Sequence, residues 1–271
     1  MKQRIVTGAV LLLLMILIFC LSHTWVYAAI MTLLCAVGTW EMLGCIGQRS
    51  NLYLSLPAMV LSVASPTLSY FFGYGTMLAV VMVYMVLLLA LAVFFDEKVK
   101  LTDVSQVFVT TLYVVMCFTA LLRLRYIENV GQYVYILVFV AAWITDTFAY
   151  FVGVFFGKHK LIPKISPKKT VEGSVGGVVF CVIAFVVYGI ILRRSFGVEV
   201  HMAALAVVGL VMSLFSQLGD LIASAIKRTY GIKDYGNVFP GHGGIIDRFD
   251  SIMILSPFLL LIAENVNFLV G

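Results

Sequence analysis

The feature that most constrains this chain is a series of apolar stretches, each long enough to cross a lipid bilayer. A transmembrane helix needs roughly 20 consecutive apolar residues. Only 11% of the 271 residues are charged, whereas a soluble domain carries about 25%, so the chain cannot cover a water-facing surface. Because helices satisfy their own backbone hydrogen bonds in lipid, the sequence predicts an all-α, polytopic membrane protein with about nine transmembrane helices. The predicted spans lie near 5–22, 25–46, 52–72, 75–95, 103–122, 133–156, 174–192, 203–226 and 251–269.

We expect these spans to form a single integral membrane domain over residues 1–271. The first apolar run, 5–21, is longer than the ~7–15 apolar residues typical of a signal peptide, which favours a transmembrane helix. The five cysteines all fall inside apolar runs without metal-ligand spacing. We interpret them as small apolar residues rather than disulfides or a zinc site.

The distribution of lysine and arginine predicts the orientation, because cytoplasmic segments of membrane proteins carry an excess of these residues. With the N-terminus inside, 14 of the 18 Lys and Arg residues fall on the inner side and four on the outer side. We therefore expect a multi-pass protein of the cell (cytoplasmic) membrane, with its N-terminus inside and its C-terminus outside. Two polar segments, 157–173 and 231–248, would then face the cytosol, and both are long enough to hold a site.

The second polar segment belongs to a longer run, 224–250, in which charged residues and glycines stand at fixed offsets. It reads SAIKRTYGIKDYGNVFPGHGGIIDRFD. Its pattern resembles, position for position, the signature of the phosphatidate cytidylyltransferases (CDP-diacylglycerol synthases). The matching positions are Ser224, Lys227, Arg228, Lys233, Asp234, Gly236, His242, Gly243, Gly244, Asp247, Arg248 and Asp250. The resemblance covers about 141–250, where the catalytic motifs are concentrated.

Asp146 is an acidic residue inside a predicted span, 133–156. A carboxylate at the bilayer centre costs about 2.5–3.5 kcal/mol on the insertion scale, which by default suggests function. The structural alternative is a helix-packing hydrogen bond to Tyr150, one turn further along the helix. The pattern Asp-x-x-Ala-Tyr-x-x-Gly that begins at Asp146 also resembles a second motif of the same family.

Asp220, Ser224 and Lys227 form one stripe at the end of the predicted span 203–226, and Arg228 flanks it. Asp220 should lie near the depth of the lipid headgroups, with the two basic residues just beyond it. The structural alternative is an intramembrane Asp–Lys pair with two basic anchors.

Asp247 and Asp250 stand three residues apart at the start of the last span. Capping of a helix N-terminus would explain one of them but not both. Several carboxylates without a His/Cys cluster suit Mg²⁺, which prefers oxygen ligands and substrate phosphates. We predict that the metal ligands are Asp220, Asp247 and Asp146. The predicted catalytic residues are Asp220, Asp247, Lys227, Arg228 and Asp250.

The first polar segment carries five lysines, and lysines and hydroxyls ahead of a helix N-terminus suit a triphosphate. Attraction to anionic lipid is the alternative role for these lysines. In the glycine-rich turn of the second segment, the glycines permit close approach of the backbone to phosphate, and His242 would hydrogen-bond there. The predicted nucleotide-binding residues are Lys164, Ser166, Lys168, Lys169, Thr170, Ser224, His242, Gly243, Gly244 and Arg248.

The resemblance implies transfer of CMP from CTP to phosphatidate, giving CDP-diacylglycerol and pyrophosphate in phospholipid biosynthesis. It also implies Mg²⁺ as cofactor, with a monovalent cation such as K⁺ as an option, and a homodimer. The expected partners are CTP, phosphatidate and membrane lipids, and we expect no nucleic acid. Three alternatives stay open: a CTP-dependent lipid kinase, a synthase acting on an archaeal-type lipid and, more remotely, a secondary transporter.

Overall fold

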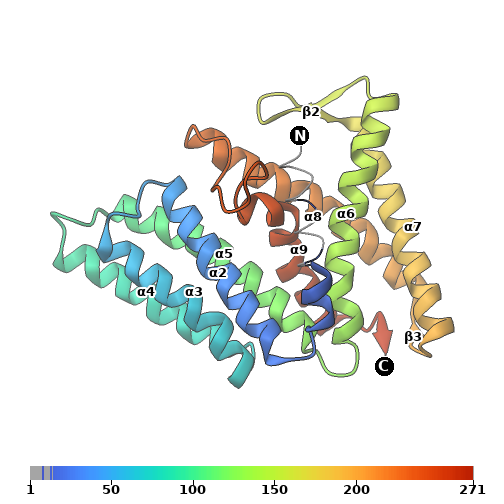
Figure 1. The fold of residues 1–271 in the computed structure, drawn as a ribbon, viewed down its shortest axis with the longest axis horizontal. Coiled ribbons are helices and arrows are strands. Elements are labelled where there is room, and N and C mark those ends of the chain that lie inside the picture. The colour runs from blue at the N-terminus through green and yellow to red at the C-terminus, as the bar shows by residue number, and fades with distance from the viewer. Residues whose placement is uncertain (1–7, 9–12, 14, 271) are drawn as a thin grey trace. The chain divides into compact units, whose positions relative to one another are not determined.

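The structure is a computed structural model that describes residue 8, residue 13 and residues 15–270. It is mostly helical, as predicted (Figure 1). Eight of the 18 residues of the first predicted span, 5–22, lie outside the described residues, and 15–20 are helical. The further helices are α2 (Trp25–Cys45), α3 (Leu52–Phe72), α4 (Thr76–Phe94), α5 (Leu101–Arg125), α6 (Gly131–Phe156), α7 (Val171–Ser195), α8 (Met202–Thr229) and α9 (Ile246–Asn265). The strands are β1 (Lys160–Ile162), β2 (Ser166–Thr170), β3 (Glu199–Val200) and β4 (Leu269–Val270).

Within the described residues, seven helices, α2 to α8, are long and apolar enough to cross a membrane. Their bounds lie within three residues of the predicted spans. A mostly helical fold with several candidate membrane spans is therefore confirmed. The helix α9 is not one of the seven, because charged residues at both of its ends lower its apolar character. A count of nine spans and the sides on which the termini lie stay predictions.

The chain divides into two compact units that interleave in sequence. The first unit combines the described part of Met1–Arg123 with Thr229–Phe249, and the second combines Leu124–Arg228 with the described part of Asp250–Gly271. The signature run is therefore shared between the two units. The prediction of a single membrane domain does not address this division and stays a prediction.

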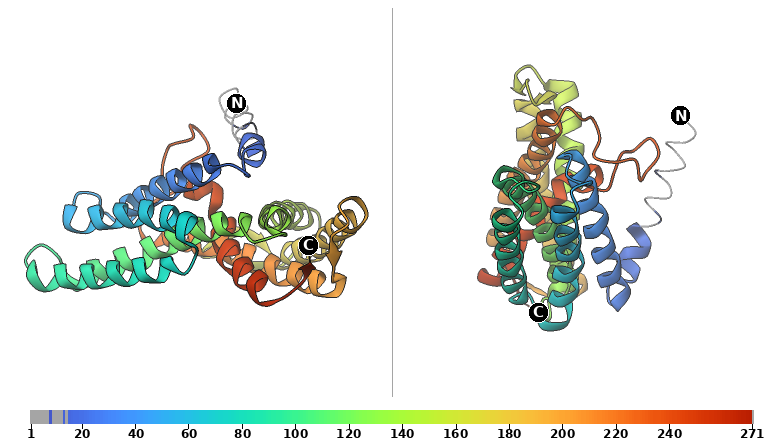
Figure 2. Two further views of the ribbon diagram at one scale, coloured as in Figure 1. Left: turned by 90° about the horizontal axis from the view of Figure 1, so that it is seen from below. Right: turned by 90° about the vertical axis from the view of Figure 1, so that its left-hand side faces the viewer.

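In the first unit, α2, α3 and α4 pack in succession and lie side by side (Figure 2). The contact face of α3 carries small polar residues that are all buried, namely Ser55, Ser62, Ser65 and Ser69. Small residues let helix backbones approach closely, and their hydroxyls bond between helices. Accordingly, the Ser65 and Thr119 hydroxyls lie 3.2 Å apart between α3 and α5. Gly38, another small residue, lets α2 approach the side chains of Val114 and Phe118 on α5.

In the second unit, α6 and α7 make the closest helix pair. Gly173 and Gly177, one turn apart on α7, face the backbone carbonyls of Ala149 and Thr145, and a Cβ at either glycine would meet that carbonyl within 2.9 Å. This G-x-x-x-G contact allows the two helices to touch backbone to backbone. The antiparallel hairpin β1–β2 lies at one end of this pair, and the antiparallel strands β3 and β4 lie at the other (Figure 1). Neither pair of strands was predicted.

Candidate functional site

The β1–β2 hairpin is held to the start of α7 by two side chains. Thr170 caps the helix, its Oγ1 accepting a hydrogen bond from the Gly173 N–H at 3.2 Å. The Glu172 carboxylate accepts from the backbone N–H groups of Lys158 and His159 at 3.1–3.3 Å, and lies 2.6 Å from His159 Nδ1. These contacts fix where the hairpin leaves α6 and where it enters α7.

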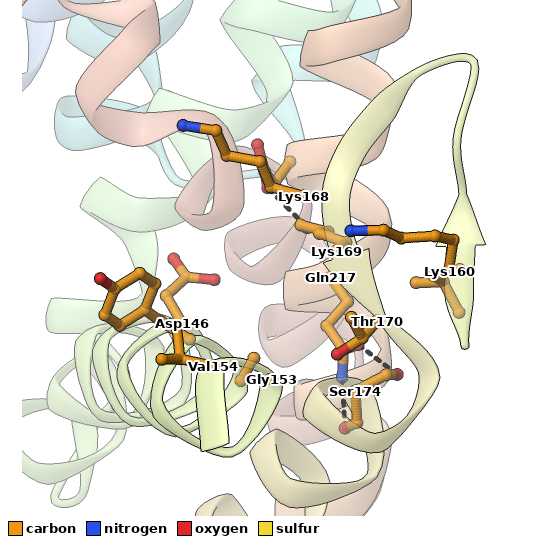
Figure 3. Close-up of a pocket in the computed structure, with 13 residues that line it drawn as sticks. Asp146, Gly153, Val154, Lys160, Lys168, Lys169, Thr170, Ser174 and Gln217 are labelled. Atoms are coloured by element: carbon orange, nitrogen blue, oxygen red, sulfur yellow. Dashed lines mark hydrogen bonds and ion pairs between the residues drawn. The ribbon is translucent and has the colours of Figure 1, made fainter. Parts of the chain in front are cut away.

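The hairpin, α6, α7 and α8 enclose a cavity of about 440 Å³ within the second unit. Figure 3 shows Asp146 on one side of this cavity, with Lys160, Lys168 and Lys169 reaching in from the hairpin. The full lining is Asp146, Ala149, Tyr150, Gly153, Val154, Lys160, Leu161, Lys168, Lys169, Thr170, Ser174, Gln217 and Asp220. Cations and carboxylates thus share one concave space among apolar helices.

Asp220 and Asp146 contact other side chains than the purely structural roles suggested by the sequence would require. Asp220 Oδ2 lies 2.5 Å from Lys169 Nζ, from the hairpin, whereas the helical stripe had suggested Lys227. Asp220 Oδ1 accepts from Ser224 Oγ at 3.5 Å, which agrees with the stripe. Asp146 Oδ2 accepts from Ser251 Oγ at 3.0 Å, so the suggested bond to Tyr150 is replaced by a contact with α9.

Asp250 is a third acidic side chain of the second unit, close enough to Asp146 and Asp220 to interact with them electrostatically. Burial raises the pKa of Asp250 above the usual aspartate range, and the neighbouring carboxylates of Asp220 and Asp146 raise it further, whereas Lys227 lowers it. Three acidic side chains from α6, α8 and α9 therefore act on one another electrostatically, and cations are their natural partners.

The oxygen donors of this group fit Mg²⁺ in the way that this ion usually binds. Among the described residues, no group of three or more His, Cys, Asp or Glu side chains is arranged to hold a metal by itself. Mg²⁺, however, is usually held by one or two carboxylates together with substrate phosphates. Asp146 and Asp220 line the same cavity as the lysines, so the donor set fits an ion that arrives with a polyphosphate.

The first unit holds the second polar region, 229–249, which comprises the loop between α8 and α9 and the first turn of α9. Two buried carboxylates organise it. Glu41, on α2, accepts from the N–H groups of Ile245 and Ile246, both at 3.0 Å. Asp247 Oδ2 accepts from the N–H groups of Tyr235 at 2.8 Å and Gly244 at 3.0 Å.

The glycines of the His–Gly–Gly turn have a structural reason inside the chain. Gly243 has φ +85°, a conformation that favours glycine, and a Cβ there would meet the Asp247 carboxylate within 2.8 Å. A Cβ at Gly244 would collide with the Glu41 carboxylate. The backbone at these glycines thus approaches two acidic side chains of the protein itself. That these glycines also bind phosphate stays a prediction.

This loop also borders a cavity of about 590 Å³. Its lining is Lys233, Asp234, Gly236, Asn237, Gly241, His242, Gly243 and Arg248. The predicted nucleotide-binding residues therefore fall in two places, one in each unit. Lys168, Lys169 and Thr170 line the cavity of the second unit, and His242, Gly243 and Arg248 line that of the first. Lys164 and Ser166 belong to the hairpin but do not line its cavity. Lys227 and Arg228 lie in the last turn of α8.

With this geometry in view, comparison with known proteins is decisive. A model of the cytidylyltransferase family matches residues 2–266. The chain belongs to this family. It is 33% identical over 269 residues to the phosphatidate cytidylyltransferase of Bacillus subtilis (strain 168), covering 96% of each chain.

Other members of the cytidylyltransferase family carry the same name. The chain is 38% identical over 180 residues to the phosphatidate cytidylyltransferase of Staphylococcus saprophyticus (strain ATCC 15305), which is 66% of each chain. It is 46% identical over 131 residues to that of Staphylococcus aureus (strain COL), which is 48% of each chain. The resemblance recognised in the sequence is confirmed.

Sequence reasoning missed four residues in these two regions. Lys160, Ser174 and Gln217 line the hairpin cavity, and Gln217 binds Ser174 through both amide atoms, at 2.5 Å and 3.3 Å. The fourth is Glu41. It is an acidic residue inside an apolar span, so the criterion that singled out Asp146 could have found it as well.

Proposed function

We propose that this protein transfers CMP from CTP to phosphatidate, giving CDP-diacylglycerol and pyrophosphate. Membership of the cytidylyltransferase family supports the proposal, as do relatives named phosphatidate cytidylyltransferase. The structural observation that carries it is the cavity of the second unit, where three lysines and two aspartates line one space (Figure 3). That combination suits a polyphosphate with its counter-ion.

The lysines of the hairpin bind the triphosphate in this proposal. Lys160, Lys168 and Lys169 project from two adjacent strands into the cavity. As flexible point charges, ammonium groups bind phosphate oxygens without demanding one geometry. Lys169 is paired with Asp220 at 2.5 Å, so binding of a triphosphate would exchange one anionic partner for another. The positive charge that accumulates at the hairpin then offsets the charge of the departing pyrophosphate.

Asp220 and Asp146 would hold Mg²⁺, with Asp250 nearby. The bound ion would supply neutralisation of the charge that develops on the phosphoryl oxygens. The carboxylates themselves orient the hairpin and α9, through Lys169 and Ser251 respectively. Asp247 as a further ligand is proposed because it is one of the carboxylates at the start of the last predicted span, and K⁺ as a second cation is proposed on the family resemblance alone.

The reaction needs no nucleophile from the protein. A phosphomonoester has its second pKa at about 6, so the phosphatidate phosphate is largely a dianion near neutral pH. One of its oxygens forms a bond to the α-phosphorus of CTP, and the bond from that phosphorus to the bridging oxygen breaks as pyrophosphate leaves. The protein contributes positioning and charge stabilisation, which dominate phosphoryl-transfer catalysis. Lys227 and Arg228, at the end of α8, would bind the lipid phosphate.

CTP labelled separately at the α- and γ-phosphates tests this proposal against its alternatives. Purified protein with phosphatidate and Mg²⁺ should place the α-label in the organic phase and the γ-label in pyrophosphate, with none left on the protein. A lipid kinase would instead deliver the γ-label to lipid, and a transporter would deliver neither label. Replacing phosphatidate with an archaeal-type lipid phosphate distinguishes the remaining synthase.

The orientation in the membrane is part of the same proposal. We place the N-terminus and both polar segments in the cytosol, the C-terminus outside and nine spans between them, on the basis of the 14-to-4 distribution of Lys and Arg. Reporter fusions at residue 271 and within 157–173 should report opposite sides of the membrane. Equal signals from both fusions would contradict the nine-span arrangement.

The homodimer rests on the family resemblance. Cross-linking in native membranes should give one band of twice the monomer mass. A monomer at every cross-linker concentration would contradict it.

A further inference from the structure

Glu41 is a buried carboxylate far from both polar segments in sequence. It lies on α2, inside an apolar span, and is only 2% exposed. Its two oxygens take different partners: Oε1 accepts from the Ile245 N–H and Oε2 from the Ile246 N–H, both at 3.0 Å. These two amides belong to the end of the 229–249 loop and the first residue of α9.

A carboxylate suits this position better than any neutral side chain. The first N–H groups of a helix have no partner within the helix, and an anion there is also favoured by the helix dipole. Two adjacent N–H donors need two acceptors. A glutamine has the same size but offers one acceptor and an amide that donates, so it would leave one buried N–H facing another donor.

The loop is shaped around this side chain. A Cβ added at Gly236 or at Gly244 would collide with the Glu41 carboxyl group. These two glycines, eight residues apart in sequence, therefore leave the space that the carboxylate fills. Sequence analysis assigned both positions to the family signature without identifying what they approach.

The residue after Ile246 is Asp247, whose Oδ2 in turn accepts from Tyr235 and Gly244. Together the two carboxylates hold four backbone N–H groups of one loop. Gly244 is common to both, because its N–H binds Asp247 while its α-carbon faces Glu41. A shift of Glu41 would therefore be passed to Asp247 and to Arg248 directly after it.

We propose that Glu41 is a positioning residue for the CMP-transfer reaction, holding the 229–249 loop so that Asp247 and Arg248 are correctly placed. This inference rests on the proposed function. Glu41 acts through the loop and does not contact the substrates. The N-terminal half of the chain, which carries no residue of the signature, would thereby take part in catalysis.

The test compares full-length wild type with Glu41→Gln and Glu41→Asp in detergent or nanodiscs. Glu97→Gln, an exposed acid of the same unit, is the matched control. Two quantities are measured: kcat for CDP-diacylglycerol formation per folded protein, and hydrogen–deuterium exchange of peptides from 229–249 and from α2–α4. Glu41→Gln should lower kcat by about 10- to 100-fold, as expected when reacting groups are misplaced by about 1 Å.

Exchange in Glu41→Gln should rise within 229–249 and stay unchanged in α2–α4. Glu41→Asp keeps two acceptor oxygens, so it should retain more activity than Glu41→Gln, and Glu97→Gln should match wild type. A wild-type kcat in Glu41→Gln would overturn the inference. So would a fall in activity that only follows loss of folded protein, with faster exchange throughout α2–α4. If wild type itself forms no CDP-diacylglycerol, the proposed function fails, and the exchange data still report whether Glu41 holds the loop.

Discussion

The hairpin cavity of the second unit and the loop of the first unit use carboxylates in opposite ways. In the cavity, Asp220 and Asp146 have side-chain partners, Lys169 and Ser251, which can rotate away. In the loop, the hydrogen bonds described above for Glu41 and Asp247 come from backbone N–H groups. The partner therefore decides what an acidic side chain can do. A carboxylate paired with a side chain is available to a ligand, whereas one paired with the backbone holds the chain in place.

Among the variants that test this comparison, Asp220→Asn should lower kcat the most. Asparagine is nearly the same size but cannot balance Lys169 or hold a divalent cation as a carboxylate does. We expect kcat to fall by at least about 100-fold, the range seen when one charge-stabilising group is removed from a site. Label transfer from α-labelled CTP measures it, with the exposed acid Glu264 as control in Glu264→Gln. Near-normal turnover with unchanged Mg²⁺ dependence would remove the metal assignment.

Asp247→Asn separates the two roles of Asp247. The two backbone bonds described above go to one oxygen, Oδ2, so the carbonyl oxygen of asparagine can accept these two and keep this part of the loop in place. If Asp247 also acts through its charge, kcat should fall by about 10- to 100-fold while hydrogen exchange in 229–249 stays as in wild type. Asp247→Ala removes the acceptor and should raise that exchange. Normal turnover in Asp247→Asn would restrict this residue to holding the loop.

Neutralising Lys168 and Lys169 together tests whether the hairpin binds the triphosphate. The double variant to glutamine should raise KM for CTP by about tenfold or more, because each charge-assisted bond is stronger than a neutral one. KM for phosphatidate should change much less. Lys158→Gln, in the same connection but outside the cavity lining, is the control. An unchanged KM for CTP would return these lysines to a role in membrane anchoring.

Glu172→Gln should have the smallest effect. Glutamine keeps one acceptor for the N–H groups of Lys158 and His159 but loses the charge opposite the His159 ring. Because these bonds are made at the surface, where water competes for the same groups, KM for CTP should rise by a few-fold and kcat should hold. Steady-state kinetics across CTP concentrations measure both. An effect as large as that of Asp220→Asn would mean that Glu172 contacts a substrate.

Most of the helical fold could be predicted, because each apolar run is bounded by turn-forming or charged residues. The spans at 25–46 and 52–72, for example, differ from α2 and α3 by at most one residue. The hairpin could not be predicted in the same way. It depends on Glu172 binding two N–H groups more than ten residues earlier. The periodicity of apolar residues, which predicts helices and strands, does not predict such a side-chain contact.

The candidate site, like the fold, could be predicted only in part from the sequence. The candidate site residues of 141–250 could be proposed because charges in an apolar chain are conspicuous and their offsets are specific. Their partners were not found. Lys169 lies 51 residues before Asp220, and Glu41 lies 204 residues before Ile245. Contacts over such distances are made only when helices pack, so the sequence pattern predicted the candidate site residues but not what holds them.

The interleaving of the two units has a consequence for anyone who wishes to shorten this protein. Every recognisable motif lies within 141–250, so a fragment that starts at residue 124 would look like a minimal enzyme by inspection of the sequence. Such a fragment would nevertheless lack α2, and with it the acceptor of the Ile245 and Ile246 N–H groups. Two buried donors would be left without partners, at a cost of about 1–3 kcal/mol each. Co-expression of 1–123 as a separate chain is therefore the better route to a split version of this enzyme.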